Sequence, residues 1–252
     1  IAIASPGQAR VDVYEYSGSG LQWNPLSSTD LSEGIKQVGG DSVSINEDGT
    51  IVAINDYDGG KSYIYQYNSG TTWDKIGELT TGQSNDGVND QNASISLNKA
   101  GNIVAVGSTS NDSNKGTVKI YKYSGGTTWD VMKTFTGSNS EQIGFSVSLN
   151  GNGNIVAFSR DYLSNQGKVQ VWEYSNSDMA NGGSWSQIGD VPSSTGYGGD
   201  RFGICISLNN DGNILAVGLS YGNIQDGSQT NLRNHVGRVH VSVSYTHLTL
   251  PT

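Results

Sequence analysis

The chain has 252 residues, with 35 glycines, 13 tyrosines and a formal net charge of −9, and this composition favours short strands and tight turns over helices. The acidic charge argues against a nucleic-acid or anionic-membrane partner, because only 14 Lys and Arg residues are available to hold phosphates. No apolar run approaches the roughly 20 residues of a membrane-spanning helix, and the single cysteine, Cys205, excludes an internal disulfide framework.

A sequence repeat organises most of the chain. Its clearest copies read SVSINEDGTIVAI from Ser42, SISLNKAGNIVAV from Ser94, SVSLNGNGNIVAF from Ser146 and CISLNNDGNILAV from Cys205. Their central alanines, Ala53, Ala105, Ala157 and Ala216, are 52, 52 and 59 residues apart. A fixed period of this size indicates blades or solenoid coils, each of which is one supersecondary unit.

Each unit contains four predicted strands. The SVSL stretch and the IVAV stretch form a hairpin around an Asn-x-x-Gly turn, and a third strand with alternating apolar residues ends in paired aromatics. The fourth strand opens at a tryptophan, at Trp23, Trp73, Trp129 and Trp185 in successive units. Trp172 stands where other units have Tyr14, Tyr65 and Tyr121. Four strands in a unit of this length predict one blade of a β-propeller.

The predicted fold class is therefore all-β, a β-propeller fragment of four to five four-stranded antiparallel blades. Residues 1–241 form a single partial propeller, with units at 1–40 (partial), 41–91, 92–143, 144–202 and 203–241 (partial). The remaining blades of the same propeller are expected partners. After Val241 the tyrosine pattern ends, and residues 242–252 are predicted to be a non-native tail.

The aromatic residues at repeat positions are predicted to pack between blades, because no unit can bury both faces of its sheet alone. This set comprises Trp23, Trp73, Trp129, Trp185, Tyr65, Tyr121 and Trp172. Residues present in every repeat usually maintain the packing of the repeat units, so these aromatics are interpreted as structural and not as ligand platforms.

The sequence DRFGICISLNNDGNILAVG, which contains Phe202-Gly203, resembles the FG-GAP class of repeats. That family includes integrin α-chains and bacterial surface proteins, and the resemblance implies a seven-bladed propeller used in adhesion. The Phe-Gly pair is intact only at this position; other units have Val38-Gly39, Gln91-Asn92 and Ile143-Gly144 instead.

Integrin-type repeats often carry a calcium loop in the turn between the first two strands. Here the turns at residues 46–49, 98–101, 150–153 and 209–212 hold two carboxylates at most, and the middle two turns hold none. Calcium wants 6 to 8 oxygen ligands, so these segments are predicted to be hairpin turns. No cofactor and no metal is expected, with calcium as an alternative that the turn sequences do not support.

No catalytic motif is apparent. The histidines His235, His240 and His247 lack ligand spacing for zinc, and Cys205 replaces the serine of the other repeats as a small buried thiol. No nucleophile elbow or phosphate-binding loop is present either. No catalytic residue is therefore predicted.

Binding residues are expected on the loops that differ between repeats, which emerge on one face of a propeller. The longest such loop is predicted at residues 220–235. The predicted ligand-binding rim consists of Asp56, Tyr57, Asp58, Asp112, Arg160, Asp161, Tyr162, Tyr197, Asp200, Arg201, Tyr221 and Asp226.

The leading functional hypothesis is a non-catalytic recognition or adhesion module that binds a protein or a glycan, part of a larger extracellular or cell-surface protein. On this hypothesis the chain is not an enzyme. One alternative is a carbohydrate-active propeller enzyme, if Arg160, Asp161, Tyr162, Asp200 and Arg201 converge around one pocket. A second alternative is a structural repeat spacer.

Overall fold

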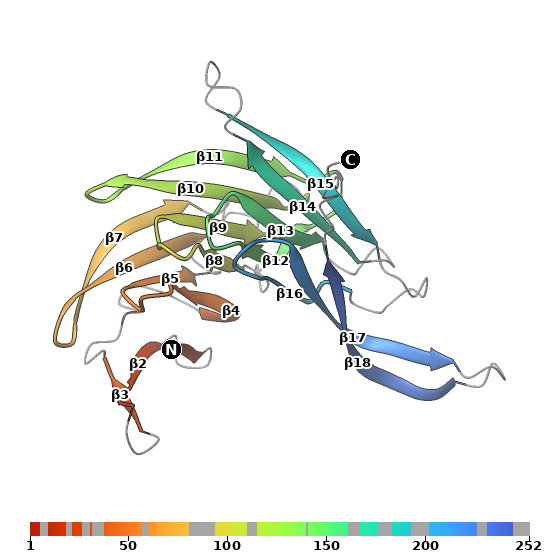
Figure 1. Ribbon diagram of the computed structural model, residues 1–252, viewed down its shortest axis with the longest axis horizontal. Helices are drawn as coiled ribbons and strands as arrows, with labels where there is room; N and C mark the ends of the chain where they lie inside the picture. The colour runs from red at the N-terminus through yellow and green to blue at the C-terminus, as the bar shows by residue number, and fades with distance from the viewer. Residues whose placement is uncertain are drawn as a thin grey trace, which may run out of the picture.

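The computed structural model describes residues 1–5, 10–18, 22–26, 31, 38–56, 60–80, 94–109, 115–139, 141–160, 167–175, 183–192, 202–225 and 231–243. These residues form five small antiparallel sheets arranged as the blades of a β-propeller (Figure 1), which confirms the predicted fold class. Within the described ranges, no helical segment has the length and hydrophobicity that spanning a bilayer would demand.

The three central blades have four strands each, hydrogen-bonded in sequence order. Blade 2 contains β4 (Val38–Ile45), β5 (Ile51–Asp56), β6 (Lys61–Ser69) and β7 (Thr72–Thr80). Blade 3 contains β8 (Ile95–Leu97), β9 (Ile103–Ser108), β10 (Thr117–Gly125) and β11 (Thr128–Thr136). Blade 4 contains β12 (Ile143–Leu149), β13 (Ile155–Arg160), β14 (Lys168–Ser175) and β15 (Ser184–Pro192).

The two outer blades have three described strands each. Blade 1 contains β1 (Ala2–Ser5), β2 (Arg10–Tyr16) and β3 (Trp23–Pro25), and blade 5 contains β16 (Cys205–Leu208), β17 (Ile214–Gln225) and β18 (Asn231–Val243). β4 begins at Val38 and β12 at Ile143, so both start shortly before the predicted unit boundaries. β18 includes Ser242 and Val243 from the segment predicted to be a non-native tail.

The predicted loop at residues 220–235 is largely a β-hairpin. β17 continues to Gln225 and pairs with β18 through Gly222↔Val236 and Gln225↔Asn231, with several register shifts. This ladder extends beyond the rest of the blade (Figure 1). Two strands that are already paired can lengthen their ladder with little additional loop-closure cost. The length and polarity of this segment predicted a loop and did not indicate the extended pairing.

Serine hydroxyls join the first strands of successive blades, β4, β8, β12 and β16. The Oγ atoms of Ser44, Ser96 and Ser148 accept hydrogen bonds of 2.9, 3.0 and 2.9 Å from the backbone N–H groups of Leu97, Leu149 and Leu208. Each of these bonds satisfies a strand N–H that faces a neighbouring blade instead of a strand of its own sheet. The recurrent serine of the repeat is therefore an inter-blade connector.

The Asn-x-x-Gly turns are also built for stacking. Asn98 Oδ1 accepts hydrogen bonds from the N–H groups of Asn102 and Ile103, at 3.0 and 2.9 Å. Gly101 has a φ of +72°, and a Cβ added there would lie 2.8 Å from Ile51 Cγ1 of the preceding blade. Glycine is therefore required both for the left-handed backbone and for the close approach of adjacent turns.

A chain of backbone hydrogen bonds links the successive turns. The N–H of Glu47 donates to the carbonyl of Lys99 at 3.2 Å, the N–H of Lys99 to Gly151 at 3.1 Å, and the N–H of Gly151 to Asn210 at 2.9 Å. This chain crosses four blades at one end of the propeller. The loops that differ between units are at the opposite end, where the second and third strands of each blade are joined.

Tryptophan and tyrosine side chains fill the spaces between blades. Trp129 is 9% exposed, and its Nε1 donates a 3.0 Å hydrogen bond to the carbonyl of Ile76 in blade 2. Trp73 makes the equivalent 3.4 Å bond to Leu26, and Tyr65 and Tyr121 are buried. Trp172 and Trp185 pack partly buried against the Phe135 side of blade 3. Trp23, by contrast, is 53% exposed.

Cys205 differs from its predicted state. The equivalent serines, Ser94 and Ser146, are buried at 3% and 6% exposure and contact the blade that follows them. Cys205 lies in the last described blade and is exposed. The prediction of a buried thiol was wrong because burial at this position comes from the next blade, not from the cysteine's own sheet.

Candidate functional site

Asp56 and Arg160 of the predicted rim lie at the strand ends opposite the stacked turns. Two of its twelve members, Asp56 and Arg160, have described side chains, and Tyr221 is placed as part of β17. The other nine lie outside the described residues: Tyr57, Asp58, Asp112, Asp161, Tyr162, Tyr197, Asp200, Arg201 and Asp226. The rim as a whole therefore stays a prediction, and its described members lie on blades 2, 4 and 5.

Asp56 is a buried carboxylate at the end of β5. It is 1% exposed, and β5 pairs it with Lys61 at the start of β6. Its neighbour Asn55 is also buried and accepts a 2.9 Å hydrogen bond from Ser62 Oγ, while no described group is bonded to Asn55 Nδ2. Asp56 thus belongs to the polar interior of blade 2 and does not present its carboxylate on the surface.

Arg160 meets a carboxylate that the sequence did not single out. At the end of β13, Arg160 Nη1 lies 3.5 Å from Oε1 of Glu141, and the two side chains are 29% and 18% exposed. Glu141 comes from the segment that joins β11 of blade 3 to β12 of blade 4. An acid and a guanidinium from different parts of the chain are thereby held together, partly shielded from water, at the rim between two blades.

The segment that carries Glu141 is anchored at both ends. Ile143 N–H donates to the Lys115 carbonyl at 3.1 Å, and Gly137 N–H donates to the Gly116 carbonyl at 3.1 Å. A Cβ on Gly116 would lie 2.2 Å from the Ile143 carbonyl oxygen, so the two loops are in close contact. The Glu141 carboxylate itself accepts a 2.8 Å hydrogen bond from the N–H of Ser138 at Oε2. This bond leaves Oε1 to face Arg160.

Gln142, directly after Glu141, has a left-handed backbone with a φ of 50°. Among the described residues it is the one non-glycine residue with positive φ. Such conformations cost of order 1–3 kcal/mol and concentrate where a loop must aim a functional group. The two anchoring hydrogen bonds hold the loop in this strained conformation. The left-handed backbone at Gln142 in turn sets the direction in which Glu141 points.

The sequence contained part of this arrangement. Arg160 was predicted for the rim. Glu141 was missed because it lies near the predicted boundary between the units 92–143 and 144–202, where the repeat pattern gave it no role. Only the antiparallel pairing of Ile143 with Arg160 brings the loop and the end of β13 together.

The opposite end of the propeller offers a different surface. Residues of the stacked turns, including Glu47, Lys99, Asn150 and Asn210, line a shallow depression of about 170 Å³. The turn asparagines use their Oδ1 atoms to accept backbone N–H groups, as Asn150 does from Ile155 at 3.0 Å. Nowhere in the described part of the chain do three His, Cys, Asp or Glu residues cluster as metal ligands would.

No model of a known protein family matches the chain, and no curated protein matches it by sequence. Several solved structures share its fold. A putative 6-phosphogluconolactonase from Bacteroides uniformis has 11% identity and a TM-score of 0.55, over 96% of this chain and 70% of that one. A periplasmic gluconolactonase from Pseudomonas aeruginosa has 14% identity and a TM-score of 0.56, over 93% of this chain and 66% of that one.

Hydrazine synthase from Kuenenia stuttgartiensis is a third similar structure, with 10% identity and a TM-score of 0.59 over 95% of this chain and 58% of that one. At these identities the likeness concerns the fold, and the chain spans between 58% and 70% of these three structures' length. All three are named as enzymes.

These neighbours correct the functional hypothesis drawn from the sequence. The predictions of a non-catalytic adhesion module and of a protein that is not an enzyme were wrong, because structures named as lactonases have this fold. The inference had rested on the lack of a short catalytic motif. Function resides in a site carried by the fold, so catalytic residues that the folded chain brings together need not be close in sequence. The carbohydrate-active alternative agrees better with these neighbours.

Proposed function

We propose that the chain is part of a propeller enzyme that hydrolyses a carbohydrate-derived lactone at the rim between blades 3 and 4. The observation that carries the proposal is the Glu141–Arg160 pair: the Glu141 carboxylate, on a strained and doubly anchored loop, lies 3.5 Å from the guanidinium at the end of β13. The names of two structural neighbours, a 6-phosphogluconolactonase and a gluconolactonase, support the choice of a lactone.

The chemistry of the pair suits addition of water to an ester carbonyl. The Glu141 carboxylate accepts a proton as a water oxygen forms a bond to the carbonyl carbon, and the carbonyl oxygen becomes an oxyanion. Arg160 places a fixed positive charge beside that oxyanion. The bond between the carbonyl carbon and the ring oxygen then breaks, and the leaving ring oxygen takes the proton from Glu141. The products are the open hydroxy acid and the regenerated carboxylate.

The hydrogen bond from Ser138 assists this role. It holds Glu141 Oε2 at 2.8 Å from a backbone N–H, so the carboxylate keeps one orientation and directs Oε1 toward Arg160 and the substrate. Groups that are positioned before the reaction lose little free energy to reorganisation during it. Arg160 and Glu141 thus supply both the charge and the proton acceptor that the reaction requires.

The experiment is hydrolysis of glucono-δ-lactone and its 6-phosphate by the purified chain, followed as acid release above the spontaneous rate. We expect Glu141→Gln and Arg160→Met each to lower kcat/KM about 100-fold or more, since a general base contributes 10²–10⁴-fold. Glu47→Gln is the matched control, because Glu47 forms an inter-blade ion pair with Lys99 at the opposite end of the propeller. That variant should keep full activity.

Two results would contradict the proposal. One is a rate no higher than spontaneous hydrolysis with either lactone. The other is an equal loss of activity in the Glu141→Gln and Glu47→Gln variants, which would assign the effect to folding and not to chemistry.

The assignment to the FG-GAP repeat class is proposed on Phe202 and Gly203. Phe202 is 1% exposed, and Gly203 has a φ of +90°; a Cβ added to Gly203 would lie 2.8 Å from the Cβ of Ser159 in blade 4. An aromatic anchor followed by a left-handed glycine would explain why this pair recurs in that class at the entrance to a blade. On this view the pair is structural, and it implies no particular ligand.

A further inference from the structure

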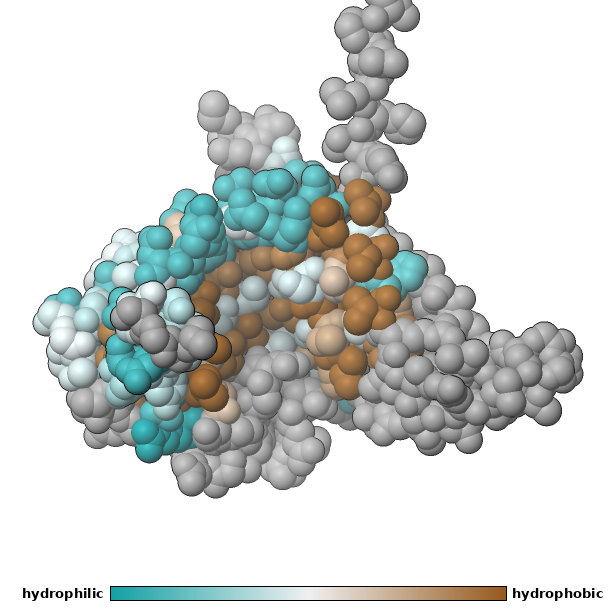
Figure 2. Space-filling model, turned by 60° about the horizontal axis from the view of Figure 1, so that its bottom comes forward, coloured by the Kyte–Doolittle hydropathy of each residue, from teal (hydrophilic) through white to brown (hydrophobic). Residues whose placement is uncertain are grey.

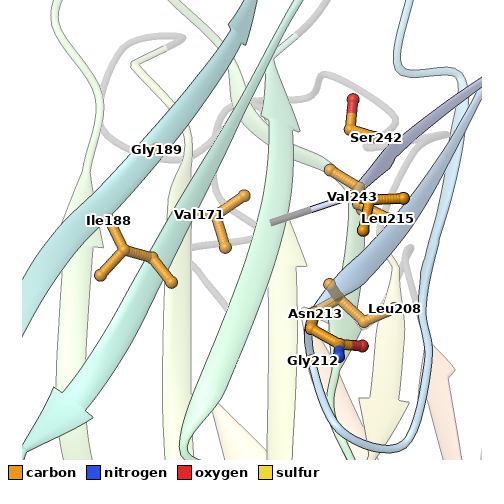
Figure 3. Close-up of a pocket in the computed structure, with 9 residues that line it drawn as sticks. All are labelled: Val171, Ile188, Gly189, Leu208, Gly212, Asn213, Leu215, Ser242 and Val243. Carbon is orange, nitrogen blue, oxygen red and sulfur yellow. The ribbon is translucent and has the colours of Figure 1, made fainter. Parts of the chain in front are cut away.

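The spaces between adjacent blades are lined by apolar side chains. Figure 2 shows hydrophobic residues gathered in a band that hydrophilic residues border. Between blades 4 and 5, a cleft of about 230 Å³ is lined by Val171, Ile188 and Leu215 among others (Figure 3). Between blades 2 and 3, Tyr121 and Trp129 are buried in the equivalent space. A charged side chain at the margin of such a space loses part of its hydration.

Lys119 lies at the margin of the space between blades 2 and 3. It is a partly buried residue of β10, and its Nζ donates a 3.0 Å hydrogen bond to the carbonyl of Thr80, the last residue of β7. The hydroxyl of Tyr121 donates a 2.7 Å hydrogen bond to the same carbonyl. The Lys119 ammonium is thus hydrogen-bonded to a neutral oxygen that it shares with a second donor.

The neighbours of Lys119 on its own sheet carry no charge. Its cross-strand partners are Val106 on β9 and Thr134 on β11. Side chains at directly opposite positions of two strands share one face of the sheet, so these are the groups that flank the amine there. Burial accordingly lowers the pKa of Lys119 below its ordinary value of 10.5.

Other lysines of the propeller face carboxylates. Glu78 forms ion pairs with both Lys61 and Lys75, and Glu47 forms one with Lys99. Hydrogen bonds to these carboxylates raise the pKa of Lys61 and of Lys99. Lys119 therefore has a larger share of neutral amine near neutral pH than Lys61 or Lys99, and the neutral amine is the nucleophilic form of lysine.

The repeat does not require a lysine at this position. In the equivalent register of β5 with β6, blade 2 has Tyr63, and in that of β13 with β14, blade 4 has Gln170. A blade therefore forms with an uncharged residue at this place. Blade stacking does not explain the amine of Lys119.

We propose that the amine of Lys119 is an acylation site for activated esters of the sugar-lactone class. The choice of a lactone rests on the proposed function, because a chain that acts on lactones is exposed to them. The reactivity of the amine rests on the contacts of Lys119 and is independent of the site at Glu141.

The acylation needs no further reactant. The neutral Nζ forms a bond to the carbonyl carbon of the lactone, and the bond between that carbon and the ring oxygen breaks. The ring oxygen takes the proton that the nitrogen loses, so the product is an amide of Lys119 with an open-chain hydroxyl. One N–H of the amine can keep its hydrogen bond to Thr80, which directs the nitrogen lone pair away from that carbonyl.

The test is acylation of the full chain carrying Glu141→Gln, in which the hydrolysis proposed above does not consume the lactone. The protein is incubated with glucono-δ-lactone or with acetic anhydride, and mass spectrometry of fragments measures amide formation at each lysine. Lys122, which is exposed on the same strand, is the internal reference. Lys119 should be acylated at least about threefold faster than Lys122 near pH 8. With acetic anhydride this ratio should fall toward one near pH 11, where lysine amines are largely neutral.

A matched pair of variants tests the missing carboxylate. Lys122 is paired with Asp130 across β10 and β11, whereas Lys119 is paired with the exposed residue Thr134. Thr134→Asp places a carboxylate opposite Lys119, and it should slow acylation there about threefold or more without affecting Lys122. Thr134→Asn is the control, because it adds a side chain of the same shape without the charge. Circular dichroism confirms that each variant is folded.

Three outcomes would overturn the inference. These are equal acylation of Lys119 and Lys122, equal acylation of Lys119 in the Thr134→Asp and Thr134→Asn variants, and a reaction of Lys119 with acetic anhydride but not with the lactone. The proposed function fails separately. A lactone adduct at Lys119, together with no catalysed hydrolysis by the chain with Glu141 intact, would support the acylation site and refute the hydrolytic site.

Discussion

Replacing Trp129 by alanine should destabilise the protein far more than the same replacement at Trp23, although both residues open the fourth strand of their blades. Trp129 is 9% exposed and Trp23 is 53% exposed. Each stacks on a tyrosine of its own blade at almost the same distance, 5.2 Å for Tyr123–Trp129 and 5.4 Å for Tyr16–Trp23. The aromatic pair therefore contributes equally to both, and the comparison isolates burial against the preceding blade.

The magnitude follows from the buried surface. A buried tryptophan removes about 150–250 Å² from water, which at about 25 cal/mol per Å² amounts to about 4–6 kcal/mol. Loss of the 3.0 Å bond to Ile76 also leaves a buried carbonyl with one acceptor site unused. We expect Trp129→Ala to lower the free energy of unfolding by about 4 kcal/mol, within the range of 3–5 for buried aromatics. Trp23→Ala should cost about 1 kcal/mol, the contribution of the aromatic pair.

Thermal unfolding followed by circular dichroism measures the difference. About 3 kcal/mol between the two variants corresponds to a difference in Tm of roughly 6–12 °C for a chain of this size. Trp129→Phe, which keeps most of the area and loses the hydrogen bond, should fall between them. Equal shifts in Trp129→Ala and Trp23→Ala would refute the reasoning, because burial between blades would then contribute nothing that stacking within a blade does not.

Other variants test separate features. Ser96→Ala should lower the free energy of unfolding by about 1–3 kcal/mol in urea titrations, because the N–H of Leu149 loses its acceptor in a part-buried interface. Gly77→Ala should cost about 1–3 kcal/mol by overpacking against Trp129, whereas Gly189→Ala should stay within about 0.5 kcal/mol, and similar Tm values for the two would contradict this. Burial raises the pKa of Tyr121 to about 12 from an ordinary value of 10. As pH rises, the Tyr121 hydroxyl therefore loses its proton at a lower pH in the unfolded state than in the folded state. Stability should consequently fall as pH rises from 10 toward 12, and Tyr121→Phe should make that decline shallower in a pH series of urea midpoints.

Much of the architecture was predictable because the repeat is a local pattern. The alternation of apolar residues in the IVAV stretches, the Asn-x-x-Gly turns and the tryptophan that opens each fourth strand indicated a blade before any contact was known. The observed pairing of Ala53 with Ile64 and of Ala105 with Ile120 places those stretches in the centre of their sheets, where strands are apolar on both faces.

The candidate site was less accessible to the sequence. Arg160 was recognised from its loop, but its partner Glu141 lies 19 residues away on the other side of a strand. Asp56 illustrates the converse error, since a carboxylate at the end of a strand was expected on the surface and is 1% exposed. Position in a loop does not state which way a side chain points, because that direction depends on the neighbouring blade.

The sequence by itself determined the blade, since turns, alternation and aromatic positions are properties of successive residues. Tertiary structure alone decided how the blades meet. Whether Trp129 is buried while Trp23 is exposed, whether Cys205 is covered, and which carboxylate faces Arg160 all depend on the presence and position of an adjacent sheet. The physical reason is that local propensities act within one unit, whereas burial and charge pairing arise between units that are distant in the chain.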